Sequence, residues 1–144
     1  MGFLKKILSL LVTIWIAVIG VLYIYVYGGI VILIGNLIGK LKGKKERKTF
    51  ISREVSRFGR AAFILSGSRV KVVGKENVPQ TGPMVIVANH QSAFDIPLIP
   101  GYVYAEISFI AKKELSKIPG INWFVSALDG VYIERGNKSQ TAGA

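Results

Sequence analysis

The sequence predicts an α/β domain that follows an N-terminal membrane segment. Two observations support this prediction: no charge occurs from Ile7 to Gly39, and short β-branched runs alternate with helical candidates from residue 69 onward. The chain has 144 residues, the length of about one domain. We expect a membrane-anchoring helix or hairpin with basic flanks over 1–48, an amphipathic helix over 49–68, and α/β structure over 69–144.

The composition excludes several kinds of chemistry. The chain has 19 Lys and Arg residues against 8 Asp and Glu, a formal net charge of +11, one His and no Cys. Without Cys, it has no disulfide framework, no thiol nucleophile and no Cys/His zinc cluster. Any chemistry that needs an imidazole must use His90. Most of the excess charge lies within residues 1–50, beside the apolar stretch, which favours an anionic membrane over a nucleic acid as partner.

The uncharged stretch is long enough for a membrane helix, which needs about 20 apolar residues. The pair Gly28-Gly29 is interpreted as a break, and this leaves two topologies. One is a single spanning helix over Ile7–Tyr27 with a short interfacial tail. The other is a helical hairpin that enters and leaves by the same face, which two basic flanks slightly favour because basic flanks stay cytoplasmic. The Lys40–Lys48 cluster is expected to hold anionic headgroups, or else to be a stop-transfer flank without lipid selectivity.

An amphipathic helix is predicted next, and Gly67 ends it. Its arginines lie on a different face from an apolar stripe at helical spacing, formed by Ile51, Val55, Phe58, Ala62 and Leu65. A basic amphipathic helix of this kind can lie on a bilayer surface. We expect instead that the stripe packs against the helix's own domain.

Four short runs rich in β-branched and other apolar residues are expected to be strands, with helical segments near 93–99 and 121–128 between them. The runs are Arg69–Val73, Met84–Ala88, Ile107–Ala111 and Val131–Glu134. Alternating strands and helices are typical of an α/β sheet.

The second run leads directly into Asn89-His90-Gln91-Ser92-Ala93-Phe94-Asp95. Sites in open α/β sheets form at the carboxyl ends of strands. A carboxylate on one ring nitrogen fixes the tautomer of a histidine, and the other nitrogen is then free to take a proton. Alternatively, Ser92 and Asp95 cap a helix and His90 is a structural histidine. The residues alone leave both interpretations open.

Three segments resemble, in order and spacing, the signature blocks of the 1-acyl-glycerol-3-phosphate acyltransferase family. They are Asn89-His90-x₄-Asp95 after an apolar strand, Ala111–Pro119, and Gly130-Val131-Tyr132-Ile133-Glu134-Arg135. The resemblance covers roughly residues 69–136. It implies a partial glycerolphosphate-acyltransferase-like sheet with flanking helices.

The resemblance also implies an activity. His90 would be the base that deprotonates the free hydroxyl of a lysophosphatidic acid, and Asp95 would orient it. The hydroxyl would attack acyl-CoA or acyl-carrier protein and give phosphatidic acid at the cytoplasmic face of the membrane, without a cofactor or metal. Arg135 and Lys112 would bind the acceptor's phosphate, a role that suits a guanidinium and an ammonium. As structural alternatives, Lys112 is a solvated strand-end charge and Arg135 pairs with Glu134.

The sequence departs from the family pattern at several places. Asp129 and Asn122 stand where the family usually has glycine, and no Phe-Pro-Glu-Gly-Thr-Arg block follows residue 135. We therefore expect a truncated copy or a fragment of a longer enzyme. Two other functions remain: the same chemistry on glycerol-3-phosphate or another lysolipid, and a catalytically inactive membrane-anchored module.

Overall fold

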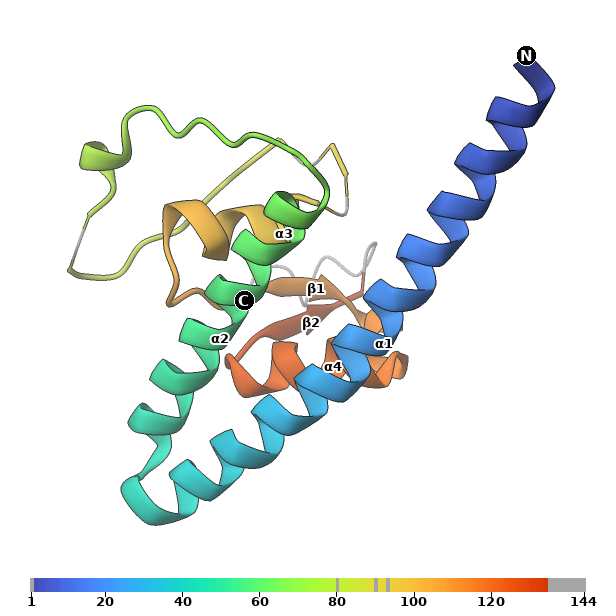
Figure 1. The fold of residues 1–144 in the computed structure, drawn as a ribbon. Helices are drawn as coiled ribbons and strands as arrows, with labels where there is room; N and C mark the ends of the chain where they lie inside the picture. Colours follow the sequence, from blue (N-terminus) through green and yellow to red (C-terminus); the bar gives the residue numbers. More distant parts are fainter. Residues whose placement is uncertain (1, 80, 90, 93, 135–144) are drawn as a thin grey trace.

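A computed structural model describes residues 2–79, 81–89, 91–92 and 94–134. Within these ranges the chain is mostly helical and carries one small parallel sheet (Figure 1). The elements are α1 (Gly2–Lys42), α2 (Lys44–Leu65), η1 (Lys75–Asn77), α3 (Asp95–Leu98), η2 (Ile99–Val103), β1 (Ile110–Lys112), η3 (Lys113–Lys117), α4 (Pro119–Ala127) and β2 (Val131–Ile133).

Helix α1 is continuous, so the predicted break at Gly28-Gly29 was wrong. A glycine inside a helix costs only about 1 kcal/mol relative to alanine, and here the missing side chain permits close packing. A Cβ on Gly28 would lie 2.9 Å from the Phe124 ring, and one on Gly35 would lie 2.8 Å from Ile51. The chain reverses instead at Gly43, whose φ of 109° is one that glycine tolerates.

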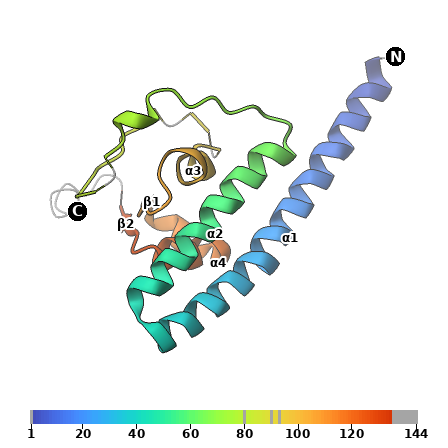
Figure 2. The same ribbon diagram turned by 60° about the vertical axis from the view of Figure 1, so that its left-hand side comes forward.

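The two halves of α1 have different surroundings. Its C-terminal half packs against α2 and α4, whereas its N-terminal half projects beyond the rest of the protein (Figure 2). The projecting half exposes apolar side chains such as Phe3, Leu11 and Trp15. By length and composition, α1 can cross a membrane.

Helix α2 lies between α1 and the α3–η2 segment and packs against both. On the α1 side, the Tyr27 hydroxyl donates to Glu54 at 2.6 Å, and Arg57 donates to the other Glu54 oxygen at 2.5 Å. On the second side, small residues such as Gly59 are buried. The predicted apolar stripe is therefore only partly correct: Ile51 is fully buried, but Leu65 is 85% exposed.

The hydrophobic core sits where α1, α2 and α4 meet. Its buried members are Val31 of α1, Ile51 of α2, and Ala127 and Leu128 at the end of α4. Tyr27, Ile32, Phe50, Val55, Phe109 and Phe124 pack around them. The core therefore joins the N-terminal helices to the β1–α4–β2 unit.

The sheet is smaller than predicted. Strands β1 and β2 are parallel, with Ile110 opposite Val131. Strand β2 lies within the expected fourth run, whereas β1 begins three residues later than the expected third run and shares only Ile110 and Ala111 with it. The runs 69–73 and 84–88 form no strand in the described structure, and Val73, Val85 and Val87 are each more than 80% exposed. A strand is stable only with a hydrogen-bonded neighbour, and the described residues provide none for these two runs.

The expected helical segments are present with shifted bounds. The segment near 93–99 forms the single turn α3, which continues as the π-helical turn η2 to Val103. The segment near 121–128 forms α4, which begins earlier because Pro119 suits the first turn of a helix.

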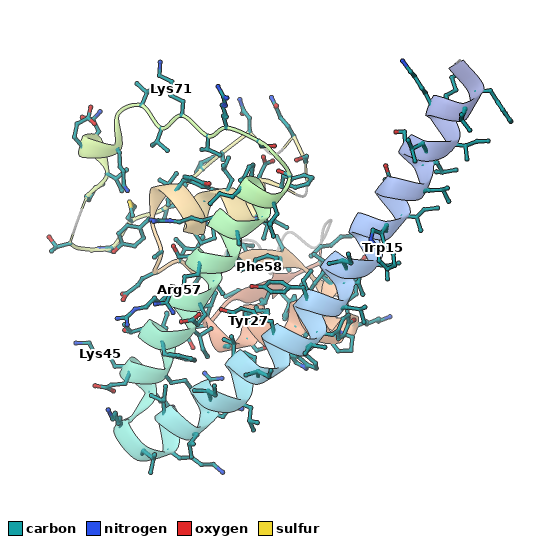
Figure 3. All side chains as sticks on the ribbon, viewed as in Figure 1. Trp15, Tyr27, Lys45, Arg57, Phe58 and Lys71 are labelled. Atoms are coloured by element: carbon teal, nitrogen blue, oxygen red, sulfur yellow. The ribbon has the colours of Figure 1, made fainter. Side chains whose placement is uncertain are left out.

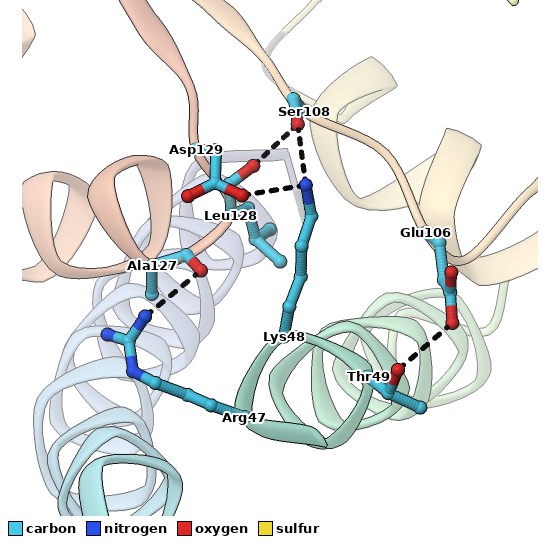
Figure 4. Close-up of polar contacts among 8 residues, drawn as sticks. All are labelled: Arg47, Lys48, Thr49, Glu106, Ser108, Ala127, Leu128 and Asp129. Carbon is cyan, nitrogen blue, oxygen red and sulfur yellow. Dashed lines mark hydrogen bonds and ion pairs between the residues drawn. The ribbon is translucent and has the colours of Figure 1, made fainter. Parts of the chain in front are cut away.

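Polar contacts hold the start of α2 against the end of α4 (Figure 4). Lys48 Nζ lies 2.8 Å from Asp129 Oδ2 and 3.5 Å from Ser108 Oγ, which in turn donates to the Leu128 carbonyl. The Lys48 hydrogen bond lowers the pKa of the Asp129 carboxyl. Asp129 has a φ of 57°, a region where glycine is the usual choice.

We expect Asp129→Asn to reduce stability by at most about 1 kcal/mol, because the ion pair is exposed to solvent. Asparagine tolerates the same backbone region, so this change removes only the charge. Since the folded-state pKa is below the unfolded value of about 4, the carboxylate stabilises the fold above that pH and loses this effect as the pH falls through the folded pKa. Thermal unfolding of both proteins at pH 7 and pH 3 checks this: the difference should shrink at pH 3, and a difference that grows would contradict it.

Candidate active site

The segment that leads into α3 folds around the Asp95 carboxylate. Its Oδ2 accepts the backbone N–H of Gln91 at 2.7 Å and that of Ser92 at 3.0 Å. Ser92 Oγ accepts the backbone N–H of Phe94 at 3.1 Å. This pattern resembles a capping box, in which an acid reaches back to the residue that caps the helix. It lies just ahead of α3, however, and Phe94, the N-cap residue of α3, makes no side-chain capping hydrogen bond.

The capping interpretation is therefore only partly correct: Asp95 reaches back to the Ser92 amide, but it is the first residue of α3 and Ser92 is not the N-cap residue of that helix. These contacts do not compete with the catalytic interpretation, because they fix the backbone that directly follows His90. His90 itself lies outside the described residues, as does Arg135. The catalytic pairing of His90 with Asp95 stays a prediction.

Helix α2 positions the α3–η2 segment that starts at Asp95. A Cβ on Gly59 would lie 2.2 Å from the Pro97 carbonyl oxygen, so the two backbones are in direct contact. Arg60 Nε donates to the Gly101 carbonyl at 2.7 Å. The Phe63 ring meets Phe94 edge to face, with centroids 5.9 Å apart. We refer to these contacts of Gly59, Arg60 and Phe63 with the segment 94–102 as the α2–η2 crossing.

Lys112 ends β1, where the structure gives it an ionic partner. Its Nζ lies 3.1 Å from Glu114 Oε1, and its side chain is half exposed. A hydrogen bond from its own backbone amide, and then the one from Lys112, lower the pKa of Glu114. Lys112 and Asp95 are thus held by separate sets of contacts, on separate elements.

The carboxyl ends of β1 and β2 lie side by side, because Lys112 is opposite Ile133 in the register. Glu134 accepts a hydrogen bond from Lys113 there. As a structural alternative to phosphate binding, Arg135 was expected to pair with Glu134. Lys113 already pairs with Glu134 and would compete for it. Neighbouring carboxyl ends of parallel strands are the usual position of a binding site in α/β proteins.

Sequence reasoning missed the α2–η2 crossing and the partners of Lys112 and Lys113. A glycine inside an otherwise helical pattern is a signal of close packing, so Gly59 was detectable. The pairing of Glu134 with Lys113 had no local signal, because it depends on the register of the two strands.

The described residues form a mostly helical structure with one small parallel sheet, whose strands β1 and β2 are connected through η3 and α4. The acyltransferase family model matches residues 69–144. The chain belongs to this acyltransferase family.

The chain is similar in sequence to three curated acyltransferases. The 1-acyl-sn-glycerol-3-phosphate acyltransferase of Saccharomyces cerevisiae is 33% identical over 110 residues, which are 76% of this chain and 35% of that protein. The enzyme of the same name from Helicobacter pylori is 32% identical over 78% of this chain and 46% of its own length. The lyso-ornithine lipid O-acyltransferase of Brucella abortus is 32% identical over 71% of this chain and 35% of its own length.

The structural similarity covers nearly the whole chain. The crystal structure of PlsC, the 1-acyl-sn-glycerophosphate (LPA) acyltransferase from Thermotoga maritima, matches with a TM-score of 0.80 and 40% sequence identity. The match covers 96% of this chain and 56% of that one. This chain therefore spans about a third to just over half of the length of these relatives.

Proposed function

We propose that this chain transfers a fatty acyl group from acyl-CoA or acyl-carrier protein to the free hydroxyl of 1-acyl-glycerol-3-phosphate, giving phosphatidic acid. Membership of the acyltransferase family and the similarity to 1-acyl-glycerol-3-phosphate acyltransferases support this reaction. The observation that carries the proposal is the Asp95 carboxylate, which accepts the backbone amides of Gln91 and Ser92, the two residues that follow His90 in the sequence.

The proposed reaction is a direct transfer between two substrates. The His90 imidazole takes the proton of the acceptor hydroxyl while the hydroxyl oxygen attacks the thioester carbonyl carbon. The tetrahedral intermediate then expels the thiolate, which takes the proton back from the imidazolium. Asp95 stabilises the imidazolium while it carries this proton. The thioester bond breaks and an oxygen ester forms, so no oxidant or reductant is needed.

Lys112 and Arg135 are the proposed partners of the acceptor's phosphate. Lys112 ends β1, and Arg135 follows the last residue of β2 by two positions in the sequence. A cation pair suits a phosphate dianion. Lys112 would exchange its present contact with Glu114 for the phosphate. Because that contact is exposed, exchanging it costs little.

The proposed location is the cytoplasmic leaflet of the cell membrane. The projecting half of α1 is apolar all round, as a helix embedded in lipid should be. Beyond Tyr27, an exposed apolar side continues through Leu33, Leu37 and Leu41 to the end of α1. A helix inclined into one leaflet would cover this whole surface, and it would leave Lys5 and Lys6 at one end and the Lys40–Lys48 cluster at the other near headgroups.

A comparison of acceptor substrates tests the proposal against the alternative functions. With a fixed acyl-CoA in detergent micelles, we expect thiol release with lysophosphatidic acid to exceed that with lyso-ornithine lipid or glycerol-3-phosphate by about tenfold or more. Both a phosphate and an acyl chain would then be needed for full binding. A preference for lyso-ornithine lipid would favour the chemistry of the Brucella abortus relative, and no release with any acceptor would favour an inactive membrane module.

A matched pair of lysines controls this experiment. Lys112→Gln should raise the KM for lysophosphatidic acid more than it changes kcat, because binding of the phosphate is lost. Lys117→Gln removes an exposed charge five residues away and should leave the KM unchanged. Equal effects of the two substitutions would remove Lys112 from the proposed phosphate site.

A further inference from the structure

The basic segment at the α1–α2 turn divides into two groups. Arg47 and Lys48 face the protein: Arg47 Nε donates to Asn36 at 3.0 Å, and Lys48 pairs with Asp129. Within the described residues, no ion pair joins Lys42, Lys45 or Arg53 to a carboxylate. These three cations are thus available to an external anion.

The three cations line one groove between the end of α1 and the start of α2. It has a volume of about 400 Å³, in the range of small-molecule sites. Ile38 and Phe50 provide its apolar lining, and Glu46 is its one acid. We call this site the elbow groove. Its formal charge is +2, so an anion is favoured electrostatically.

An apolar row leads out of the elbow groove along α1. Ile30, Ile34 and Ile38 are spaced four residues apart, which places them on one face of the helix, and Lys42 is the next member of the same row. Ile30 is 51% exposed and Ile34 is 42% exposed. The row from Ile30 to Ile38 is about 12 Å long, at 1.5 Å per residue. Cations at one end and an exposed apolar row behind them match an amphiphile with an anionic head.

We propose that the elbow groove binds the headgroup of an anionic phospholipid whose acyl chain lies along Ile38, Ile34 and Ile30. The apolar row decides between a lipid and free phosphate, because an inorganic ion would leave the row uncovered. The site is separate from the candidate active site: α3 packs on the other end of α2, away from the turn (Figure 1). The proposal therefore does not depend on the acyl-transfer chemistry.

Retention of lipid by the purified chain in a neutral detergent tests this site. Dioleoylphosphatidylglycerol is titrated in, with dioleoylphosphatidylcholine as the neutral comparison, and native mass spectrometry counts the bound lipids. We expect one phosphatidylglycerol to bind in preference to phosphatidylcholine. The variant Lys42→Gln/Lys45→Gln/Arg53→Gln should weaken its binding by about tenfold or more, since each cation near an anionic lipid contributes about fivefold.

A second triple variant controls for net charge. Arg69→Gln/Lys71→Gln/Lys75→Gln removes the same charge from an exposed segment at the opposite end of α2, as the positions of Lys45 and Lys71 in Figure 3 show. It should leave the affinity for phosphatidylglycerol within about twofold. Equal losses in the two triple variants would overturn the elbow groove as a site, because they would mean diffuse electrostatic attraction.

Two further experiments test whether the ligand is an anion and whether it is a lipid or free phosphate. Glu46→Gln removes the acid from the groove and should tighten phosphatidylglycerol binding, whereas Glu76→Gln, in η1, should not. Inorganic phosphate in millimolar excess should fail to displace the lipid, because it lacks the acyl chain. Displacement by phosphate, or a Glu46→Gln variant that binds phosphatidylglycerol more weakly, would overturn the proposal.

Discussion

Replacing Gly59 with alanine is expected to destabilise the protein by about 2 kcal/mol. An alanine Cβ at this position would lie 2.2 Å from the Pro97 carbonyl oxygen and 3.1 Å from Gly101 Cα. Because both neighbours are backbone atoms, they move only if α2 separates from η2. Overpacking of this kind costs about 1–3 kcal/mol or more, and the better helix propensity of alanine offsets only about 1 kcal/mol of it.

Gly20→Ala is the matched control, since Gly20 is also helical and a Cβ there meets nothing within 4 Å. Thermal unfolding followed by circular dichroism in detergent compares the two variants with the parent. We expect Gly59→Ala to unfold at a lower temperature and Gly20→Ala to match or exceed the parent. Equal stability of Gly59→Ala and the parent would show that the α2–η2 crossing is looser than described.

Asp95→Asn is expected to reduce acyl transfer by about 10³-fold, within the range of general acid–base effects. An asparagine oxygen in the position of Oδ2 still accepts the Gln91 and Ser92 amides, so the capped turn remains folded. The negative charge that stabilises the His90 imidazolium in the proposed mechanism is lost. The substitution therefore separates the two interpretations of Asp95.

If Asp95 only caps α3, Asp95→Asn retains most of the parent's turnover, and only Asp95→Ala loses it. If Asp95 also supports the base, both variants lose turnover. The initial rate of thiol release from acyl-CoA with lysophosphatidic acid distinguishes these outcomes. The thermal unfolding of each variant separates lost chemistry from lost folding.

Local patterns predicted the features of the fold that local interactions determine. The apolar α1 follows from an uncharged run long enough for a membrane helix, and α4 and β2 lie where a helical segment near 121–128 and a strand over 131–134 were expected. The continuity of α1 did not follow. Gly28 is a helix breaker by propensity, but it packs against Phe124, which lies far along the chain. Propensity is a weak prior that tertiary packing overrides.

The expected sheet also shows that local sequence does not determine which long-range contacts form. Residues 84–88 have the composition of a buried strand, yet Val85 and Val87 are exposed in the described structure. Composition identifies a segment that is able to pair, whereas the strand forms only where a partner is present. Strands β1 and β2 have each other as partners, and both formed close to their predicted positions.

The candidate site was predicted in part. The resemblance identified the family, which the comparisons confirmed. The residues alone left two roles open for Asp95, a helix cap and a catalytic partner, and the structure adds its contacts with the backbone amides of Gln91 and Ser92. Partners set by strand register, such as Glu134 for Lys113, have no signature in the local sequence.

The central claim is that the His90 imidazole is the base for acyl transfer to a lysophosphatidic acid. The most direct test is the rate at which purified His90→Ala converts labelled lysophosphatidic acid and acyl-CoA to phosphatidic acid, at saturating concentrations of both. We expect a loss of about 10³-fold while the protein still inserts into micelles and unfolds at the parent's temperature. A rate within about tenfold of the parent's would be too small a loss for a general base and would contradict the claim.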